Sequence, residues 1–298
     1  SPSRRARVMK FPELTYATAE DPRWKQGGIR SIERLSGRNY FVPYYEHWRR
    51  EIVPQGGAII GPALGLIDID VNIASGTFPP KLDDDAPLIV VANHPYGILD
   101  GLGTHSLVER LGRPYKVLIN NDLLRAPEIR PYSLPIHFSQ TREAQALNLQ
   151  TRREALRHLG EGTTVVVFPA GGVATSPTTF GRAVDLPWKR FTARMIHSSR
   201  AQVLPLYFEG QCSPLFQFVS KFSLTLRLAL IIREFRVRVG QPLRVHVGDV
   251  IPPEACQEIR DRQALMMMLY EKVHALGGLD AVEVRTRVDQ LPEWLREL

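Results

Sequence analysis

His94 and Asp100, six positions apart, are the residues of this chain best suited to moving a proton from a hydroxyl group. An imidazole titrates near neutral pH and can accept a proton through either Nε2 or Nδ1. A carboxylate bonded to the other ring nitrogen would fix the tautomer and stabilise the imidazolium that forms. Because a histidine after a strand is also often an ordinary turn residue, the elements around the pair must decide its role.

An apolar run before the pair predicts the strand that positions it. Residues 88–91 are uncharged and mostly β-branched, which is typical of a buried strand in a sheet covered on both faces. The chain then turns, because Pro95 has no N–H for a sheet ladder and Gly97 allows backbone angles closed to other residues. A helix should begin near Asp100 and end at Gly112.

A second predicted strand, residues 164–168, also runs into a turn, and this turn contains two consecutive glycines. Paired glycines let backbone N–H groups approach a ligand closely, either an oxyanion or a phosphate. A plain turn is the alternative. Ligands of open α/β sheets bind at the carboxyl ends of strands, so we expect this turn and the one containing His94 to frame one crevice.

A third block, Val203-Leu-Pro-Leu-Tyr-Phe-Glu-Gly210, follows further along the chain. In this order, the His-plus-Asp turn, the Phe-Pro-x-Gly turn and the third block resemble the signature of the glycerolipid (lysophosphatidic acid-type) acyltransferase superfamily. They are most similar to its bacterial hemolysin-like lysophospholipid acyltransferase branch, over about residues 85–248. The chain departs from the best-known pattern at two places: five residues instead of four separate His94 from Asp100, and Ala170 stands where the familiar block has Glu.

The resemblance implies an O-acyltransferase that moves a fatty acyl group from acyl-CoA or acyl carrier protein to the hydroxyl of a lysolipid. His94 would take the proton of that hydroxyl, and Asp100 would orient the ring. No cofactor is implied, because the acyl thioester is a co-substrate. We also expect no metal, since the eight histidines never pair with Cys or acids at ligand spacing. The implied substrate-binding residues are Asn93, Tyr96, Gly97, Arg142, Phe168, Pro169, Ala170, Gly171 and Gly172.

Two kinds of lysolipid remain as alternatives for the acceptor of the acyl group. In the wider superfamily, an arginine in the block that corresponds to the region of Arg142 binds the phosphate of the acceptor. Here the clean motif is absent and Arg142 is the nearest candidate, with a solvent-facing residue at the start of a helix as the alternative. The absence of the clean phosphate-binding motif favours a lyso-aminolipid, such as lyso-ornithine or lyso-glutamine lipid, over 1-acylglycerol-3-phosphate.

The formal net charge of +7 narrows the classes of partner. Basic surfaces suit nucleic acid, anionic membranes or anionic substrates, but zinc-finger, helix-turn-helix and aromatic RNA-binding signatures are absent, so we expect no nucleic-acid partner. The longest uncharged run, residues 56–67, is too short to span a bilayer and contains Pro62. We therefore expect a peripheral protein at the cytoplasmic face of the inner membrane. A basic membrane-binding module without catalysis is the alternative.

The order of apolar runs predicts an α/β fold, with a mixed, mostly parallel sheet wrapped by helices and 44% hydrophobic residues to build its core. We expect a helical, membrane-proximal extension over 1–80, an acyltransferase domain over 81–250 and a helical cap over 251–298, all packed as one unit. Local patterns further predict a strand at 66–73, a helix at 141–159 with Leu149 inward, a helix opening at 185–190 with Pro187 in its first turn, a hairpin of 235–239 with 243–247, and one helix from Pro253 to Leu276.

Overall fold

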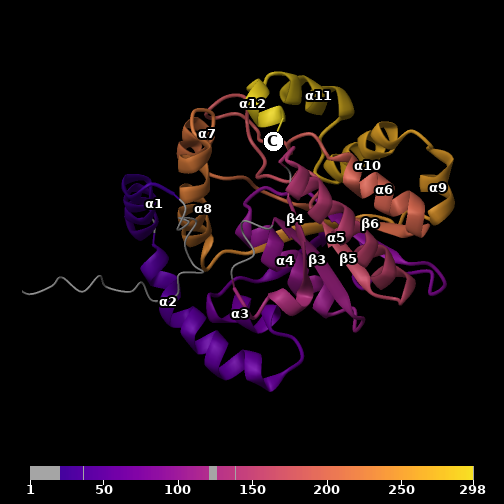
Figure 1. Cartoon of the computed structure of the whole chain (residues 1–298), viewed down its shortest axis with the longest axis horizontal. Helices are drawn as coiled ribbons and strands as arrows, with labels where there is room; N and C mark the ends of the chain where they lie inside the picture. The colour runs from indigo at the N-terminus through magenta and orange to yellow at the C-terminus, as the bar shows by residue number, and fades with distance from the viewer. Residues whose placement is uncertain (1–20, 36, 121–125, 138, 298) are drawn as a thin grey trace, which may run out of the picture.

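A central sheet of seven strands organises the computed structural model, which describes residues 21–35, 37–120, 126–137 and 139–297 (Figure 1). The sheet order is β1-β7-β6-β2-β5-β3-β4. The strands are β1 Val71–Ser75, β2 Leu88–Ala92, β3 Tyr115–Asn120, β4 Ser133–Ile136, β5 Thr164–Val167, β6 Gln202–Phe208 and β7 Leu243–Val247. Five of the six neighbouring pairs are parallel and only β6 with β7 is antiparallel. The predicted mixed, mostly parallel sheet is confirmed.

Helices cover both faces of this sheet (Figure 1). Along β2, Ile89 and Val91 pack into one core with residues of α5, α6 and α10, whereas Val90 packs into the other core with residues of α3, α4 and α8. This alternation explains why the run 88–91 is apolar throughout. The helices are α1 Arg23–Leu35, α2 Arg38–His47, α3 Ile60–Leu66, α4 Ile98–Glu109, α5 Arg142–Gly160, α6 Arg190–Ser199, α7 Pro214–Val219, α8 Leu224–Arg238, α9 Pro253–Glu258, α10 Arg262–Leu276, α11 Ala281–Asp289 and α12 Glu293–Arg296.

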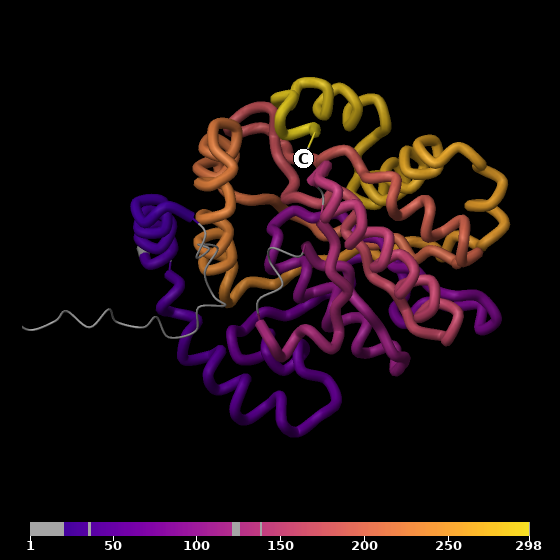
Figure 2. Tube along the Cα trace, in the orientation of Figure 1, coloured from indigo at the N-terminus to yellow at the C-terminus, as the bar shows by residue number. Residues whose placement is uncertain are grey.

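The first two helices lie against a helix from much later in the chain. In Figure 2 the indigo segment of α1 runs beside the orange segment of α8, and the residue contacts agree. Stacked rings of Phe41 in α2 and Phe235 in α8, with centroids 4.6 Å apart, hold the two regions together. The first twenty residues of the predicted N-terminal extension lie outside the described residues.

The predicted hairpin of 235–239 with 243–247 is wrong. Residues 235–238 continue α8, which begins at a Ser223 N-cap and meets no helix breaker before Gly240, where φ is +80°. The alternation Phe-Arg-Val-Arg-Val fits a strand over five residues, but the longer helical run overrides it. β7 pairs instead with β1 and with β6.

The predicted strand at 66–73 begins only at Val71, because residues 60–66 form the helix α3. A run containing Gly61, Pro62 and Gly65 has poor helix propensity, so this helix was not expected. The Glu109 carboxylate at the end of α4 accepts the N–H groups of Ile59, Ile60 and Gly61 at 2.6, 3.1 and 2.8 Å. This distant carboxylate satisfies the otherwise unpaired donors of the first turn.

Three smaller expectations also differ from the structure. The α6 helix begins at Arg190, so that Pro187 precedes the helix and does not lie in its first turn. The last predicted helix is divided into α9 and α10, because Asp261 caps a new helix by accepting the N–H of Ala264 at 2.7 Å. On α5, Leu149 is exposed, while Ala155 and Leu159 face the core.

Candidate active site

The sheet order places the three blocks of the sequence side by side. β2 lies between β5 and β6 and is parallel to both, with Val91 opposite Val167 and Ala92 opposite Leu206. The carboxyl ends of the three strands therefore meet at one edge of the sheet, where ligands of open α/β sheets bind.

The ring of His94 is held by Asp100. His94 Nδ1 forms a short hydrogen bond with Asp100 Oδ2, while Asp100 Oδ1 accepts the N–H groups of Tyr96 and Gly97, both at 2.9 Å. Asp100 is fully buried, whereas 18% of the His94 side chain is exposed. With Nδ1–H donating to the carboxylate, Nε2 is the ring nitrogen that can accept a proton.

The five-residue spacing between the two residues has a local cause. Gly97 adopts φ +89° and forms the N-cap of α4, which places Asp100 at the third position of the helix, facing back into the turn. A Cβ added at Gly97 would lie 3.0 Å from Cγ2 of Val173, so the turn also packs tightly against the second block. A side chain at this position would be strained by the positive φ and by this contact.

The electrostatics of the site favour the protonated base. Burial alone would lower the pKa of the His94 imidazole, but the charge and the hydrogen bond of Asp100, together with the more distant charge of Asp185, outweigh it. The pKa of His94 is therefore raised above its ordinary value of 6.5, while Arg227 opposes this shift. An acid beside an imidazole stabilises the imidazolium in this way.

The main chain of His94 is held as firmly as its ring. The His94 N–H donates to Asp185 Oδ1 at 2.9 Å, and the His94 carbonyl accepts the N–H of Ala174 at 2.8 Å. The ring of Phe168 lies 4.7 Å from the imidazole, centroid to centroid. All three contacts come from the segment after β5, so the second block and the base form one unit.

Within the second block, the two glycines differ in their backbone conformation and contacts. Gly171 adopts φ +70°, and its N–H donates to the carbonyl of Phe168 at 3.1 Å. Gly172 packs closely, since an added Cβ would lie 2.9 Å from Leu186 Cδ1. Pro169 and Ala170, in the same turn, are buried.

Two predicted substrate-binding residues have protein partners. The amide of Asn93 accepts the N–H of Phe208 at 2.7 Å and donates to its carbonyl at 3.0 Å, thereby extending the contact between β2 and β6. The buried Tyr96 ring leaves no room for a Cβ at Gly210, which would lie 1.9 Å from the tyrosine hydroxyl. These contacts join the first block to the third.

Arg142 stands apart from the other predicted residues. It is the first residue of α5, exposed, and follows β4 at the edge of the sheet, where β3 and β5 separate β4 from β2. The structure therefore brings together the residues 93–100 and 168–172, and leaves Arg142 at the periphery.

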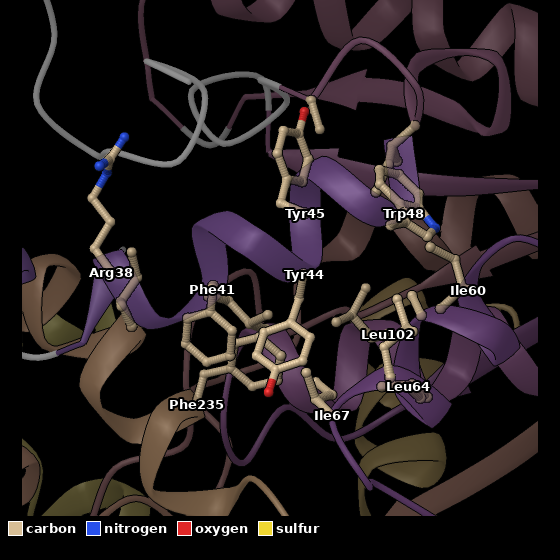
Figure 3. Close-up of a pocket in the computed structure, with 16 residues that line it drawn as sticks. Arg38, Phe41, Tyr44, Tyr45, Trp48, Ile60, Leu64, Ile67, Leu102 and Phe235 are labelled. Atoms are coloured by element: carbon tan, nitrogen blue, oxygen red, sulfur yellow. The ribbon is translucent and has the colours of Figure 1, made fainter. Parts of the chain in front are cut away.

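An apolar pocket of about 220 Å³ lies beside the start of α4. Figure 3 shows Phe41, Tyr44, Leu64 and Leu102 directed into a common space between α2, α3, α4 and α8. Among the described residues that line it, Arg38 carries a charge, and it extends away from the aromatic side chains. The lining is suited to a hydrocarbon chain and not to a polar ligand.

Sequence reasoning missed two buried charged residues that the structure places beside the base. Asp185, fully buried, contacts the main chain of His94, and Arg227, 2% exposed, donates to the carbonyl of Val173 and at 2.7 Å to Thr175 Oγ1. For Asp185 a weak signal existed, because a single acid stands between the apolar residues Val184 and Leu186.

Two negative findings concern only the described part of the chain. Within it, no group of three or more His, Cys, Asp or Glu side chains is arranged to hold a metal ion. None of its helices combines the length and the apolar character needed to cross a membrane.

Comparisons with known proteins show which family the chain belongs to and which proteins it is similar to. Residues 70–248 match the family model described as acyltransferase. A lyso-glycine lipid O-acyltransferase of Phocaeicola vulgatus is 29% identical over 202 residues, which cover 61% of this chain and 68% of that protein. The crystal structure of the 1-acyl-sn-glycerophosphate (LPA) acyltransferase PlsC from Thermotoga maritima aligns with a TM-score of 0.49 and 16% identity, over 84% of this chain and 94% of that one.

Proposed function

Because this chain belongs to the acyltransferase family, we propose that it is a lysolipid O-acyltransferase that uses His94 as its general base. The observation that carries the proposal is the arrangement of His94 and Asp100. The bond to Asp100 occupies Nδ1, and within the described part of the chain Nε2 has no hydrogen-bond partner. The ring is partly exposed and lies at the edge where three strands end.

In the proposed reaction, Nε2 of His94 takes the proton of the acceptor hydroxyl as its oxygen attacks the thioester carbonyl carbon. The tetrahedral intermediate then collapses, the C–S bond breaks, and the departing thiolate receives the proton from the imidazolium. Asp100 holds the ring and stabilises its positive charge throughout. Proton transfer of this kind contributes typically ~10²–10⁴-fold to the rate.

The oxyanion needs a hydrogen-bond donor, and the structure narrows the choice. The N–H groups of Tyr96 and Gly97 are used by Asp100, and that of Gly171 is used by Phe168. In the described part of the chain, the N–H groups of Ala170, Gly172 and Val173 show no acceptor, and of these residues Gly172 is partly exposed while the other two are buried. We assign the oxyanion contact to Gly172 on this basis.

We assign the apolar pocket to a fatty acyl chain of one of the two substrates. Ile98 and Leu102, which line the pocket, stand on the same first turns of α4 that carry Asp100. A chain seated there would be anchored close to the reacting groups, and its burial would stabilise the complex by about 0.8 kcal/mol per CH₂.

For the acceptor we propose a lyso-aminolipid. The curated relative acts, by its name, on a lyso-glycine lipid. The placement of Arg142 at the far edge of the sheet also separates the nearest candidate for a phosphate contact from His94. 1-Acylglycerol-3-phosphate is the second acceptor to be tested.

The enzyme is proposed to work at the cytoplasmic face of the inner membrane, with acyl-CoA or acyl carrier protein as donor. Exposed apolar side chains on α7, at the start of α8 and in the turn between them support contact with lipid: Leu215, Phe218, Phe222 and Leu224. Gln217 of the same helix accepts the N–H of Ser176 at 2.8 Å, so this apolar surface is linked directly to the segment that follows the second block.

The test is thiol release from palmitoyl-CoA and from palmitoyl carrier protein, with lyso-glycine lipid, lyso-ornithine lipid and 1-acylglycerol-3-phosphate offered in parallel. We expect release with one acceptor, lowered ~10²–10⁴-fold by His94→Ala, and unchanged in His158→Ala, a control on the surface of α5. Binding to vesicles without thiol release for any pair of substrates would instead indicate a non-catalytic membrane-binding module. Undiminished release by His94→Ala would contradict the mechanism.

A further inference from the structure

Asp185 is a buried carboxylate in the segment between β5 and α6 that the reaction above does not use. Its Oδ1 accepts the main-chain N–H of His94 at 2.9 Å, and its Oδ2 accepts the indole N–H of Trp188 at 2.8 Å. The side chain is fully buried. Its two oxygens are thus divided between the base and a neighbouring tryptophan.

The helix α10, from the C-terminal part of the chain, holds the main chain of Asp185. The hydroxyl of Tyr270 donates to the Asp185 carbonyl at 2.7 Å, and the Asp185 N–H points to His274 Nε2 at 3.5 Å. His274 Nδ1 donates to the Tyr270 carbonyl at 2.8 Å, and burial lowers the pKa of His274 to about 4, so that its ring is neutral. Residues outside the matched range 70–248 therefore reach the base through Asp185.

A purely structural role is a poor account of this acid. Burying a carboxylate away from water costs several kcal/mol unless other groups compensate the charge, and the positive charge that develops on His94 is such a group. Burial raises the pKa of the Asp185 carboxyl to about 7, even though its hydrogen bonds and the charge of His94 act in the opposite direction. A proton on His94 therefore favours ionised Asp185, and ionised Asp185 favours that proton.

We propose that Asp185 is a positioning residue for the base: it fixes the main chain of His94 and supplies a second negative charge as the imidazolium forms. This role rests on the proposed function of His94. Asp100 then orients the ring from α4, while Asp185 orients the backbone from the segment after β5. Neither contact can replace the other, because each fixes a different part of the residue.

Several ionisable groups share this environment and contribute to its titration. Those that face Asp185 are His94, Asp100, Tyr207, Tyr270 and His274, and Arg227 faces His94 from α8. Tyr207 and Tyr270 stay neutral near pH 7, because burial raises the pKa of both hydroxyls. A variant that changes only the charge of Asp185 should therefore act on His94.

The decisive variant is Asp185→Asn, which keeps the shape and an oxygen for the His94 N–H, removes the charge, and leaves the indole N–H of Trp188 without its acceptor. We expect kcat to fall about 10- to 100-fold with little change in KM. We also expect the acid limb of the pH profile of kcat/KM to move at least ~0.5 pH unit lower, because the imidazolium loses a negative neighbour. NMR titration of the His94 ring should show the same downward shift without any substrate.

Glu234→Gln is the matched control, since Glu234 is also a buried carboxylate but bonds Ser213, at 2.5 and 3.0 Å, and not the base. Its pH profile should equal that of the wild type. Trp188→Phe is the second test, because loss of the indole N–H disfavours ionised Asp185 and should shift the titration of His94 in the same downward direction.

The outcomes separate this role from the proposed function. An Asp185→Asn protein that folds and keeps the wild-type pH profile and His94 titration would overturn the positioning role, while leaving acyl transfer by His94 intact. If Asp185→Asn does not fold, an unshifted profile in Trp188→Phe overturns it equally. If wild-type protein shows no His94-dependent thiol release, the proposed function falls, and the positioning role falls with it.

Discussion

At the scale of single residues, contacts with four other residues fix the position of His94. Asp100 holds Nδ1, Asp185 and Ala174 hold the main chain, and Phe168 lies over the ring. Nε2 is the ring nitrogen that these contacts leave for the acceptor hydroxyl. A general base prepared in this way needs little reorganisation when the acceptor binds.

The dependence of activity on pH follows from the same contacts. Because the base must be neutral and the pKa of His94 is raised above 6.5, kcat/KM should rise with pH along a limb centred above 6.5. In Asp100→Asn this limb should move to lower pH, because the carboxylate that stabilises the imidazolium is lost.

The same substitution should lower kcat by about 10²–10⁴-fold, because an amide no longer fixes the Nδ1–H tautomer. A pH series of thiol release measures both effects, and Asp249→Asn, an exposed acid beyond β7, is the control. A limb centred below 6.5 in the wild type would contradict the assigned role of Asp100.

At the scale of elements, α3 shows how a distant residue decides local structure. Glu109 closes the first turn of α3 through three backbone N–H groups, and Ile60 and Leu64 of that helix line the apolar pocket. Glu109, at the end of α4, therefore stabilises a helix that lines the pocket. The pocket itself lies beside the start of α4.

Glu109→Gln should lower the free energy of unfolding by about 1–2 kcal/mol, because an amide has one acceptor oxygen for three donors. Urea denaturation followed by circular dichroism measures the change. Glu161→Gln is the control: Glu161 pairs with Arg157 on the exposed end of α5, and loss of such a pair costs about 0–1 kcal/mol. Equal stability losses in both variants would argue against the capping role.

At the scale of the whole molecule, the apolar pocket is built by elements from three distant parts of the chain. Phe41 comes from α2, Leu102 from α4 and Phe235 from α8 (Figure 3). The N-terminal helices are therefore part of the proposed substrate site. The division of the chain at residues 80 and 250 stays a prediction, although β1, before residue 80, already belongs to the central sheet.

Filling the pocket should change which acyl chains react. Ala63, on α3, lines the pocket, and in Ala63→Phe we expect transfer of a sixteen-carbon chain to fall about tenfold relative to an eight-carbon chain. Competition between the two thioester donors, and between lysolipids of the two lengths, measures the ratio. Ala146→Phe, at an exposed position on α5, is the control, and an unchanged ratio in Ala63→Phe would remove the pocket from the substrate site.

The sequence by itself determined what is local. The strand, the turn and the first helical turn that carry His94 and Asp100 lie within about a dozen residues, so backbone propensities and the special roles of Pro95 and Gly97 suffice to predict them. The three ordered blocks also predicted the acyltransferase family, which the family match confirms. The hemolysin-like branch and the acceptor stay predictions.

Only the tertiary structure decided the contacts made across long separations. Residues 235–238 alternate like a strand, yet they complete the long helical run of α8, which packs against α1 and α4. Asp185 reaches His94 across 91 positions, and Glu109 reaches Ile59 across 50. No local pattern records such pairs, because the free energy that selects them comes from burial and from hydrogen bonds that exist only once the sheet has brought its neighbours together.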